Sequence, residues 1–369
     1  MKRAAAAAIS LMTGLAMLTG CSRAEVEETI QPLVADAIEE SDSEAEAVKE
    51  EDESPLIPEI DTDIKIHAGS RIAVVSKCVK GEYWKMVKKG MEDAVKEINK
   101  AYGYKKDDQI TMTFEGPDNE EDVETQINTI DAVIAENPDV LCISASDMDS
   151  CEAQLEAAKE NGIPVIAFDS NVAEKKLVKA YRGTDNVQVG KMAAYQLGSA
   201  LGKMGKVAVF SAQQKTKSVQ DRVEGFMNNI GKYGDIEVVE TIYSDQVDDM
   251  ETAMKEVLDK YPALDGVFCT NADVTELYLG LEKSDAGDAP ALVGVDATTK
   301  QQEAIRNGEE IGCVSQQSYA MGYQTIWTAA ETTAPKKSVT IEKNLLLNPA
   351  WIDSESVDDP DSSAYLYTE

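Results

Sequence analysis

Short apolar runs alternate with helical repeats of apolar residues along the middle of the chain. Segment 163–168 is a near-continuous apolar run, and Asp-Ser-Asn follows it at 169–171. This arrangement is typical of a strand that is covered on both faces. Similar runs at 71–76, 110–114 and 140–143 are separated by segments in which apolar residues recur at helical spacing. The pattern predicts a doubly wound parallel sheet with helices on both faces.

The same alternation repeats in the second half of the chain. Helical patterns over 219–230 and 250–261 lie between further strand-like runs. Strands separated by helices require parallel sheets with right-handed crossovers. We therefore expect two α/β domains, each built on a doubly wound parallel sheet. The strands predicted in this half are 206–210, 237–242, 264–269, 292–295 and 311–314.

The first twenty residues do not fit the alternating pattern. Lys2 and Arg3 precede an apolar run over 4–17, which is too short to span a bilayer comfortably, and a Leu-Thr-Gly-Cys sequence ends at Cys21. This segment resembles a bacterial lipoprotein signal peptide, 1–20, after which the acylated Cys21 becomes the mature N-terminus. The alternative is a secretory signal followed by a coincidental cysteine.

Two acidic segments flank the alternating region. Residues 21–69 are crowded with Asp and Glu and contain prolines at 55 and 58. Such a segment buries too little apolar surface to offset its ordering entropy, so we expect a disordered tether behind the lipid. We expect the acidic tail at 353–369 to be mobile as well, and the sequence indicates no function for it.

The whole chain is strongly acidic, with 35 Lys and Arg against 68 Asp and Glu and a net charge of −33. Such a surface repels phosphate backbones, so we expect no nucleic-acid partner. The one histidine, His67, precedes the first strand, which argues against His-based zinc sites and Ser-His-Asp catalysis within the core. The cysteines have no CxxC spacing and indicate neither a zinc site nor a disulfide scaffold. A bridge between Cys142 and Cys151 stays open.

Several motifs follow one another over roughly residues 70–352. They read AVVS with GEYW, NGIPVIAFDS, GTDNVQVGKMAAYQLG, DRVEGF, FCTNAD, VGVDAT and VSQQSYAMG. By their order and spacing together, these motifs resemble the type I periplasmic sugar-binding proteins, the ribose-binding group in particular.

The resemblance implies a two-lobed clamp that closes on one small sugar or polyol and delivers it to an ABC permease. The chain would cross between the lobes near 184–186, near 317–318 and near 344–348, which makes a three-crossing hinge. The implied N-terminal lobe comprises 70–184 plus 318–346, and the C-terminal lobe comprises 185–317 plus 347–352. The protein would be a monomer in the cell envelope, extracytoplasmic and held to the membrane only by its lipid.

The ligand contacts implied by the resemblance all lie just after a predicted strand or at the start of the following helix. Carboxylates accept hydroxyl hydrogen bonds, amides donate and accept together, and flat aromatic rings pack on the C–H face of a sugar. The alternatives are core packing for the aromatic residues, and turn or capping roles for Asp169, Asn271 and Asp296. The implied contacts are Tyr83, Trp84, Asp169, Gln220, Arg222, Asn271, Asp296 and Gln316.

This chain departs from the ribose binders where they carry arginines. Ser170 stands where they have one arginine and Gln220 where they have another, while Lys80 and Gly81 replace a loop that holds an asparagine. Ribose itself is therefore doubtful as the ligand, and a different sugar or polyol is expected.

Three other classes of function are alternatives to sugar import. The sequence contains no GxGxxG, GxxxxGK[ST] or GxSxG, so we expect no enzyme and no cofactor. A transcription regulator of this fold would begin with a basic helix-turn-helix, where this chain has a signal and an acidic tether. The remaining alternative is a sensor subunit that presents a sugar or furanosyl signal to a chemoreceptor or sensor kinase, which the sequence does not separate from import.

Overall fold

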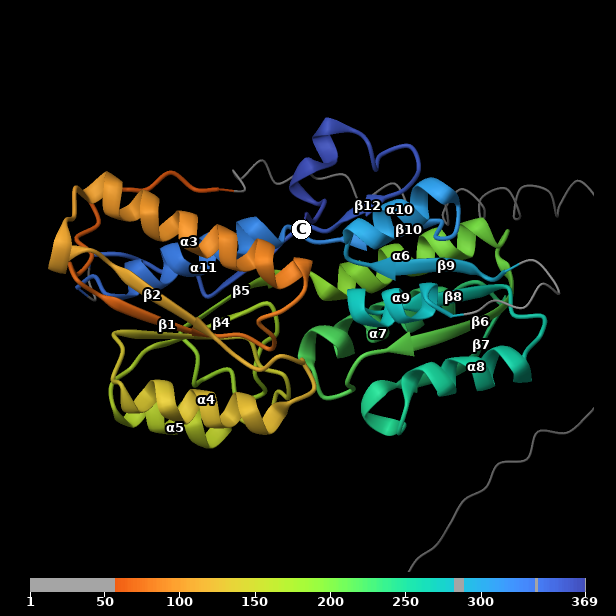
Figure 1. The fold of residues 1–369 in the computed structure, drawn as a ribbon, viewed down its shortest axis with the longest axis horizontal. Coiled ribbons are helices and arrows are strands. Elements are labelled where there is room, and N and C mark those ends of the chain that lie inside the picture. Colours follow the sequence, from red (N-terminus) through yellow and green to blue (C-terminus); the bar gives the residue numbers. More distant parts are fainter. Residues whose placement is uncertain (1–56, 282–288, 336–337, 369) are drawn as a thin grey trace, which may run out of the picture. The chain divides into compact units, whose positions relative to one another are not determined.

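The computed structural model describes residues 57–281, 289–335 and 338–368. Within these ranges the chain forms two α/β lobes, and each lobe contains a six-stranded sheet (Figure 1). The predicted signal peptide, Cys21 and most of the predicted tether lie outside the described residues. No helix in the described ranges is long and apolar enough to cross a bilayer.

The first lobe is a fully parallel sheet with the strand order β11-β5-β4-β3-β1-β2. Alternate residues of its strands face opposite helix layers. Ile72 and Val74 pack against α3 and α11, while Ala73 and Val75 pack against α4 and α5. The strands are β1 (Arg71–Val75), β2 (Thr111–Glu115), β3 (Val140–Ile143), β4 (Val165–Phe168), β5 (Ala180–Thr184) and β11 (Asn344–Leu347), and the helices are α3 (Glu82–Tyr102), η1 (Lys106–Asp108), α4 (Val123–Ala135), α5 (Glu152–Glu160) and α11 (Ser318–Thr332).

The second lobe has the order β12-β10-β9-β8-β6-β7, and only β12 is antiparallel to its neighbour. Helices α6 and α7 cover one face, and α8 and α9 cover the other. Its strands are β6 (Met204–Ser211), β7 (Asp235–Tyr243), β8 (Gly266–Cys269), β9 (Ala291–Val295), β10 (Gly312–Ser315) and β12 (Ala350–Ile352). Its helices are α6 (Asn186–Ala200), α7 (Lys217–Ile230), η2 (Ser244–Gln246), α8 (Met250–Lys260), α9 (Ala272–Leu279), α10 (Thr299–Asn307) and η3 (Pro360–Ala364).

The chain passes between the two sheets three times, which confirms the fold class that the sequence predicts. It leaves the first sheet after β5, returns after β10 through α11, and leaves again between β11 and β12. The crossings coincide with the segments that the resemblance implies. The carboxyl ends of both parallel sheets consequently meet at one junction.

The structure differs from the sequence prediction at both acidic segments. Residues 57–69, assigned to the disordered tether, lie against the first lobe because Ile57, Ile60, Ile64 and Ile66 pack into its core. The tail, expected to be mobile, is ordered over 353–368, and Val357 and Tyr367 are each only 1% exposed. In both cases a few apolar residues within an acidic stretch supply the packing.

The sequence predicts nine strands and does not predict β5, β11 or β12. Strand β5 was missed because it carries a buried charge. Strand β5 has the sequence AYRGT, and its Arg182 is 4% exposed. The Arg182 guanidinium donates to the carbonyls of Tyr181 and Glu342 and to the Thr328 hydroxyl. The open question of a Cys142–Cys151 bridge is also answered, since both cysteines are free and buried.

Candidate functional site

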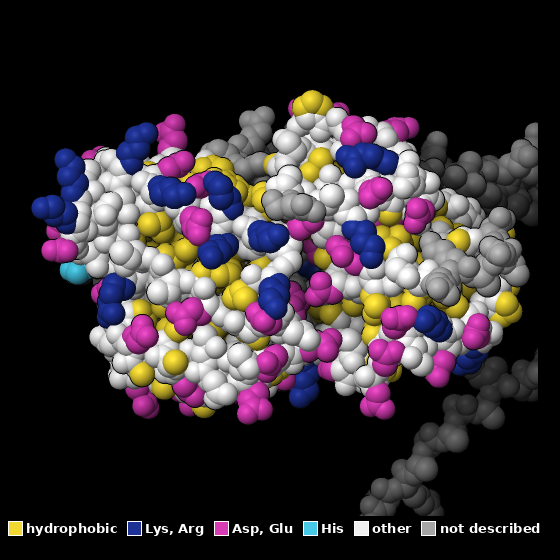
Figure 2. All heavy atoms as spheres, viewed as in Figure 1, with side chains coloured by type: hydrophobic (Ala, Val, Ile, Leu, Met, Phe, Trp, Pro, Cys, Tyr) yellow, Lys and Arg dark blue, Asp and Glu magenta, His cyan; other side chains and the backbone are white. Residues whose placement is uncertain are grey.

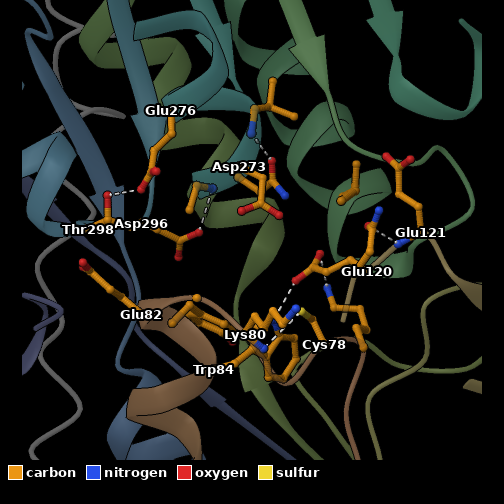
Figure 3. A pocket seen from close by; sticks show the side chains of 18 of the residues that line it. Cys78, Lys80, Glu82, Trp84, Glu120, Glu121, Asp273, Glu276, Asp296 and Thr298 are labelled. Atoms are coloured by element: carbon orange, nitrogen blue, oxygen red, sulfur yellow. Dashed lines mark hydrogen bonds and ion pairs between the residues drawn. The ribbon is translucent and has the colours of Figure 1, made fainter. Parts of the chain in front are cut away.

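A cavity of about 630 Å³ lies at the junction of the lobes, where the loops after the strands of both sheets meet. Its volume is within the range typical of small-molecule sites. Figure 3 shows Trp84 and Glu120 on one side, facing Asp273 and Asp296 on the other. The residues implied as ligand contacts that line this cavity are Tyr83, Trp84, Asp169, Arg222, Asn271, Asp296 and Gln316.

Asp169 follows β4 with a left-handed backbone, φ 53°, and it is 3% exposed. Its Oδ1 accepts a hydrogen bond from the Tyr83 hydroxyl at 2.7 Å. Its Oδ2 accepts one from the Ser144 hydroxyl at 2.7 Å and lies 3.1 Å from Lys77 Nζ. A backbone of this kind costs about 1 to 3 kcal/mol and persists where the surroundings hold it. Protein donors therefore fix this carboxylate before any ligand arrives.

We call the sides of the cavity formed by the first and second lobes its first and second walls. Lys77 is a buried cation of the first wall. Its Nζ also lies 3.5 Å from Glu120 Oε2 and 5.7 Å from the centre of the Trp84 ring. Burial lowers the pKa of Lys77, but the Asp169 and Glu120 carboxylates outweigh burial and raise the pKa above its ordinary value. Burial likewise raises the pKa of Asp169, but Lys77 with the Tyr83 and Ser144 hydroxyls brings it below the ordinary value. Both groups are therefore charged at neutral pH.

The aromatic residues of the first wall serve the core and the cavity together. Trp84 is 3% exposed and belongs to the apolar core of the first lobe, yet its indole N–H donates to Glu120 Oε1 at 2.8 Å at the edge of the cavity. The Tyr83 ring meets it edge-on, with the centroids 5.0 Å apart. Both rings thus pack in the core of the first lobe and also line the cavity, so core packing does not exclude contact with a ligand.

Asp296 occupies the matching position in the second lobe, directly after β9. It too has a left-handed backbone, φ 80°, and it is 4% exposed. Its Oδ1 accepts hydrogen bonds from Gln316 Nε2 at 2.7 Å and from the Tyr367 hydroxyl at 2.9 Å. Its Oδ2 accepts one from the backbone N–H of Ala272 at 3.2 Å.

Helix α7 and the N-terminal cap of α9 hold other polar groups of the second wall. Asn271 caps α9, because its Oδ1 accepts from the Val274 N–H at 3.1 Å, and it lines the cavity as well. Arg222, on α7, donates to Asn186 Oδ1 and to the Thr270 carbonyl, both at 2.8 Å. Gln220 lies two positions earlier on α7, about 200° around the helix. Among the described residues it is not part of the cavity lining, so the structure does not bring it to the other implied contacts.

Acidic groups crowd the second wall. Asp273 reaches into the cavity from the first turn of α9, near Glu276 and Asp296. Its own side chain is exposed, yet enclosure between the walls and the Glu120, Glu276 and Asp296 carboxylates raise its pKa to about 7. Figure 2 shows other acidic side chains around the hollow between the lobes. The described residues contain no group of three or more His, Cys, Asp or Glu placed to hold a metal ion.

Direct hydrogen bonds join the two lobes around the cavity. On one side, Glu82 Oε2 accepts from the Thr299 N–H at 2.7 Å. On the other side, the Thr216 hydroxyl donates to the Ser146 carbonyl at 2.6 Å, and the Met148 N–H donates to the Lys215 carbonyl at 3.1 Å. The structure thus shows the clamp in a closed arrangement.

Sequence reasoning missed four groups that build this site. Lys77, Ser144 and Glu120 follow strands β1, β3 and β2 within a few residues, so the rule that ligands bind at strand carboxyl ends could have found them. Tyr367 carried no such signal. It comes after the last strand, in a segment that the sequence indicates only as acidic.

Two parallel-sheet lobes, a three-crossing hinge and a polar cavity between the lobes define a periplasmic binding protein fold. The sequence profile of the periplasmic binding protein domain family matches residues 72–337. The chain belongs to this family, and the resemblance to type I periplasmic sugar-binding proteins is confirmed.

Individual relatives are distant in sequence. The ribose import binding protein RbsB of Bacillus subtilis is 26% identical over 207 residues, which are 56% of this chain and 66% of that protein. The xylitol-binding protein of Mycolicibacterium smegmatis is 25% identical, with 57% and 60% covered. The chain thus aligns with less than two thirds of the length of these relatives. An ABC transporter solute binding protein from Agrobacterium vitis, with bound D-fucose, has a TM-score of 0.73 and 26% identity, covering 80% of this chain and all of that one.

Proposed function

We propose that this protein captures a monosaccharide or a similar polyol between its lobes and delivers it to an ABC permease. One observation carries the proposal. Asp169 and Asp296 follow strands β4 and β9 of opposite lobes, and both line one cavity that interlobe hydrogen bonds enclose. A ligand that contacts both carboxylates stabilises the closed clamp, because only that form offers both walls.

The chemistry of the lining supports a neutral, hydroxyl-rich ligand. Carboxylates, the Asn271 and Gln316 amides and the Lys77 ammonium together present both acceptors and donors, as a ring of hydroxyl groups requires. The Trp84 ring adds an apolar surface. Similar proteins support the same class of ligand. Two of them are named for ribose and xylitol, and a solved structure contains bound D-fucose.

A thermal-shift screen of the full chain tests the ligand class. D-Ribose, D-fucose, D-fructose, xylitol, disaccharides and furanosyl signals would be compared with amino acids as the control class. A ligand at a hundredfold excess over its dissociation constant stabilises the protein by about 2.7 kcal/mol. Stabilisation by an amino acid, with no response to any sugar or polyol, would contradict the proposal.

The cellular setting follows from the N-terminal residues and the family. We infer that the protein is extracytoplasmic, lies in the cell envelope as a monomer, and touches the membrane only through a lipid at Cys21. The Leu-Thr-Gly-Cys sequence and the acidic segment behind it support this inference. Co-purification of the permease with the sugar-loaded protein from solubilised membranes would test the delivery step.

A further inference from the structure

The acidic C-terminal tail is firmly attached to the second lobe. The Tyr367 N–H donates to the Ala297 carbonyl at 3.0 Å, and the Tyr367 carbonyl accepts from Gln302 Nε2 at 2.8 Å. The Ser315 hydroxyl donates to the Tyr365 carbonyl at 2.5 Å. These bonds fix the last residues beside strands β9 and β10, directly behind the cavity wall. The matched family region ends at residue 337, so the tail lies outside it.

Although its backbone belongs to the second lobe, the Tyr367 ring packs with the first. Tyr367 is 1% exposed and lies in the apolar cluster built by α3, α11 and the first sheet. The centre of its ring is 5.8 Å from that of Tyr83, with the planes tilted by 60°. The tail thereby places the Tyr367 side chain across the boundary between the two lobes. The lobes separate at this boundary when the clamp opens.

The hydroxyl of the same residue occupies part of the Asp296 carboxylate. Tyr367 and Gln316 together donate two hydrogen bonds to Oδ1, whereas Oδ2 receives one from a backbone N–H. An ionised carboxylate has about two acceptor positions on each oxygen. The accepting capacity left for a ligand therefore lies mainly on Oδ2.

Tyr367 forms part of the support behind the wall and does not plug the cavity. Asp296, Gln316 and Tyr83 all contact Tyr367 and all line the cavity, while Tyr367 itself, within the described residues, does not. Burial, followed by the charge of Asp296, raises the pKa of Tyr367 well above its ordinary value, so its hydroxyl remains a donor at neutral pH.

We propose that Tyr367 is a positioning residue of the ligand cleft: its hydroxyl orients Asp296 toward the ligand, and its ring joins the two walls of the closed clamp. The role of the hydroxyl in orienting Asp296 toward a ligand rests on the proposed function. The role of the ring in joining the two walls does not, because it concerns the protein alone.

The first experiment measures affinity. Tyr367→Phe keeps the ring and removes only the hydroxyl, and Tyr323→Phe is the matched control, because the Tyr323 hydroxyl donates to Glu97 at 2.6 Å outside the cavity. Both full-length variants would be titrated calorimetrically with D-ribose, xylitol and D-fucose. For every probe that the wild type binds, we expect Tyr367→Phe to weaken binding about tenfold and Tyr323→Phe to leave it unchanged. Equal or tighter binding by Tyr367→Phe would overturn the positioning role.

The second experiment needs no ligand. The amides of Thr299 and Met148 donate across the lobe boundary, so their hydrogen exchange reports how often the clamp opens. Tyr367→Ala should speed exchange at both amides about tenfold and leave amides within β1 and β9 at wild-type rates. Tyr323→Phe should change none of them. Unchanged exchange at Thr299 and Met148 would overturn the joining role. If no sugar or polyol of the thermal-shift screen binds the wild type, the sugar-binding function fails, and this measurement alone decides whether the tail joins the lobes.

Discussion

Tyr83 and Tyr367 lie ring against ring at the base of the cleft, and each donates its hydroxyl to the aspartate of a different lobe. Tyr83 donates to Asp169 at 2.7 Å, and Tyr367 donates to Asp296 at 2.9 Å. The two aspartates follow equivalent strands, and both adopt left-handed backbones. The two walls therefore share one arrangement, in which a buried tyrosine donates a hydrogen bond to an aspartate with a left-handed backbone, although the tyrosines come from unrelated segments.

Removing the Lys77 ammonium should destabilise the protein and weaken ligand binding. Lys77→Met leaves Asp169 and Glu120 without their buried cation, and losing one partner of a buried pair costs about 3 kcal/mol. Urea denaturation measures this loss. Lys77→Met combined with Asp169→Asn should be more stable than Lys77→Met alone, because the stranded charge is gone.

An exposed pair provides the control for this prediction. Lys255 and Glu251 form an ion pair at 2.6 Å on the surface of α8, and such pairs contribute about 0 to 1 kcal/mol. Lys255→Met should therefore change stability far less than Lys77→Met. Equal effects of the two substitutions would show that Lys77 does not act as a buried ion-pair partner.

Two substitutions at Asn271 separate its capping role from its role in binding. Asn271→Ser keeps a side-chain oxygen that caps α9 and removes the amide that faces the cavity. We expect about tenfold weaker sugar binding with little change in thermal stability. Asn271→Ala should lose both, with about 1 kcal/mol less stability. Wild-type affinity in Asn271→Ser would limit the residue to its structural role.

The sequence predicts the walls of the cleft because they follow a rule that can be read locally. Asp169 and Asp296 each come directly after an apolar strand, and parallel strands bring their carboxyl ends to one edge of a sheet. Gln220 shows where carry-over by position fails, since a shift of two residues on α7 turns a side chain away from the face that carries Arg222.

Other parts of the site depend on contacts that no local pattern encodes. Tyr367 lies 71 residues after Asp296 in the sequence, in an acidic segment without periodicity. Strand β5 contains Arg182, whose buried guanidinium donates hydrogen bonds to the neighbouring Tyr181 carbonyl and to two groups far away in the sequence, the Thr328 hydroxyl and the Glu342 carbonyl. Composition alone describes both segments as polar.

Cys21→Ser should release the protein from membranes. The substitution removes the thiol that the predicted lipoprotein signal would acylate, and one sequence feature, the Leu-Thr-Gly-Cys run, motivates the prediction. Membrane fractionation followed by mass spectrometry of the N-terminal peptide measures the outcome. Recovery of the wild-type chain in the soluble fraction with an unmodified Cys21 would contradict it, and Cys78→Ser, at a cysteine buried in the first lobe, is the control.

The buried carboxyl of Glu310 should make the second lobe less stable as the pH rises. Glu310 is 1% exposed, its Oε1 lies 3.3 Å from Gln301 Nε2, and its Oε2 has no partner among the described residues. Burial raises the pKa of Glu310 to about 8, well above the ordinary value of 4.5. Between these two pH values the folded protein holds a proton that the unfolded chain has released. Stability is therefore highest below pH 4.5 as far as this group is concerned, and it falls as the pH rises toward 8.

Glu310→Gln removes this titration while keeping the shape of the side chain. Each pKa unit corresponds to about 1.36 kcal/mol, so the contribution lost across this range is on the order of 5 kcal/mol. Urea denaturation at pH 5 and pH 8.5 should show that Glu310→Gln is more stable than the wild type at the higher pH and that the gap closes at the lower pH. Glu309→Gln, at the exposed neighbour, should keep the wild-type pH dependence. If the wild type and Glu310→Gln lose the same stability between pH 5 and pH 8.5, the pH dependence belongs to other groups, among them Asp273, whose pKa is raised to about 7.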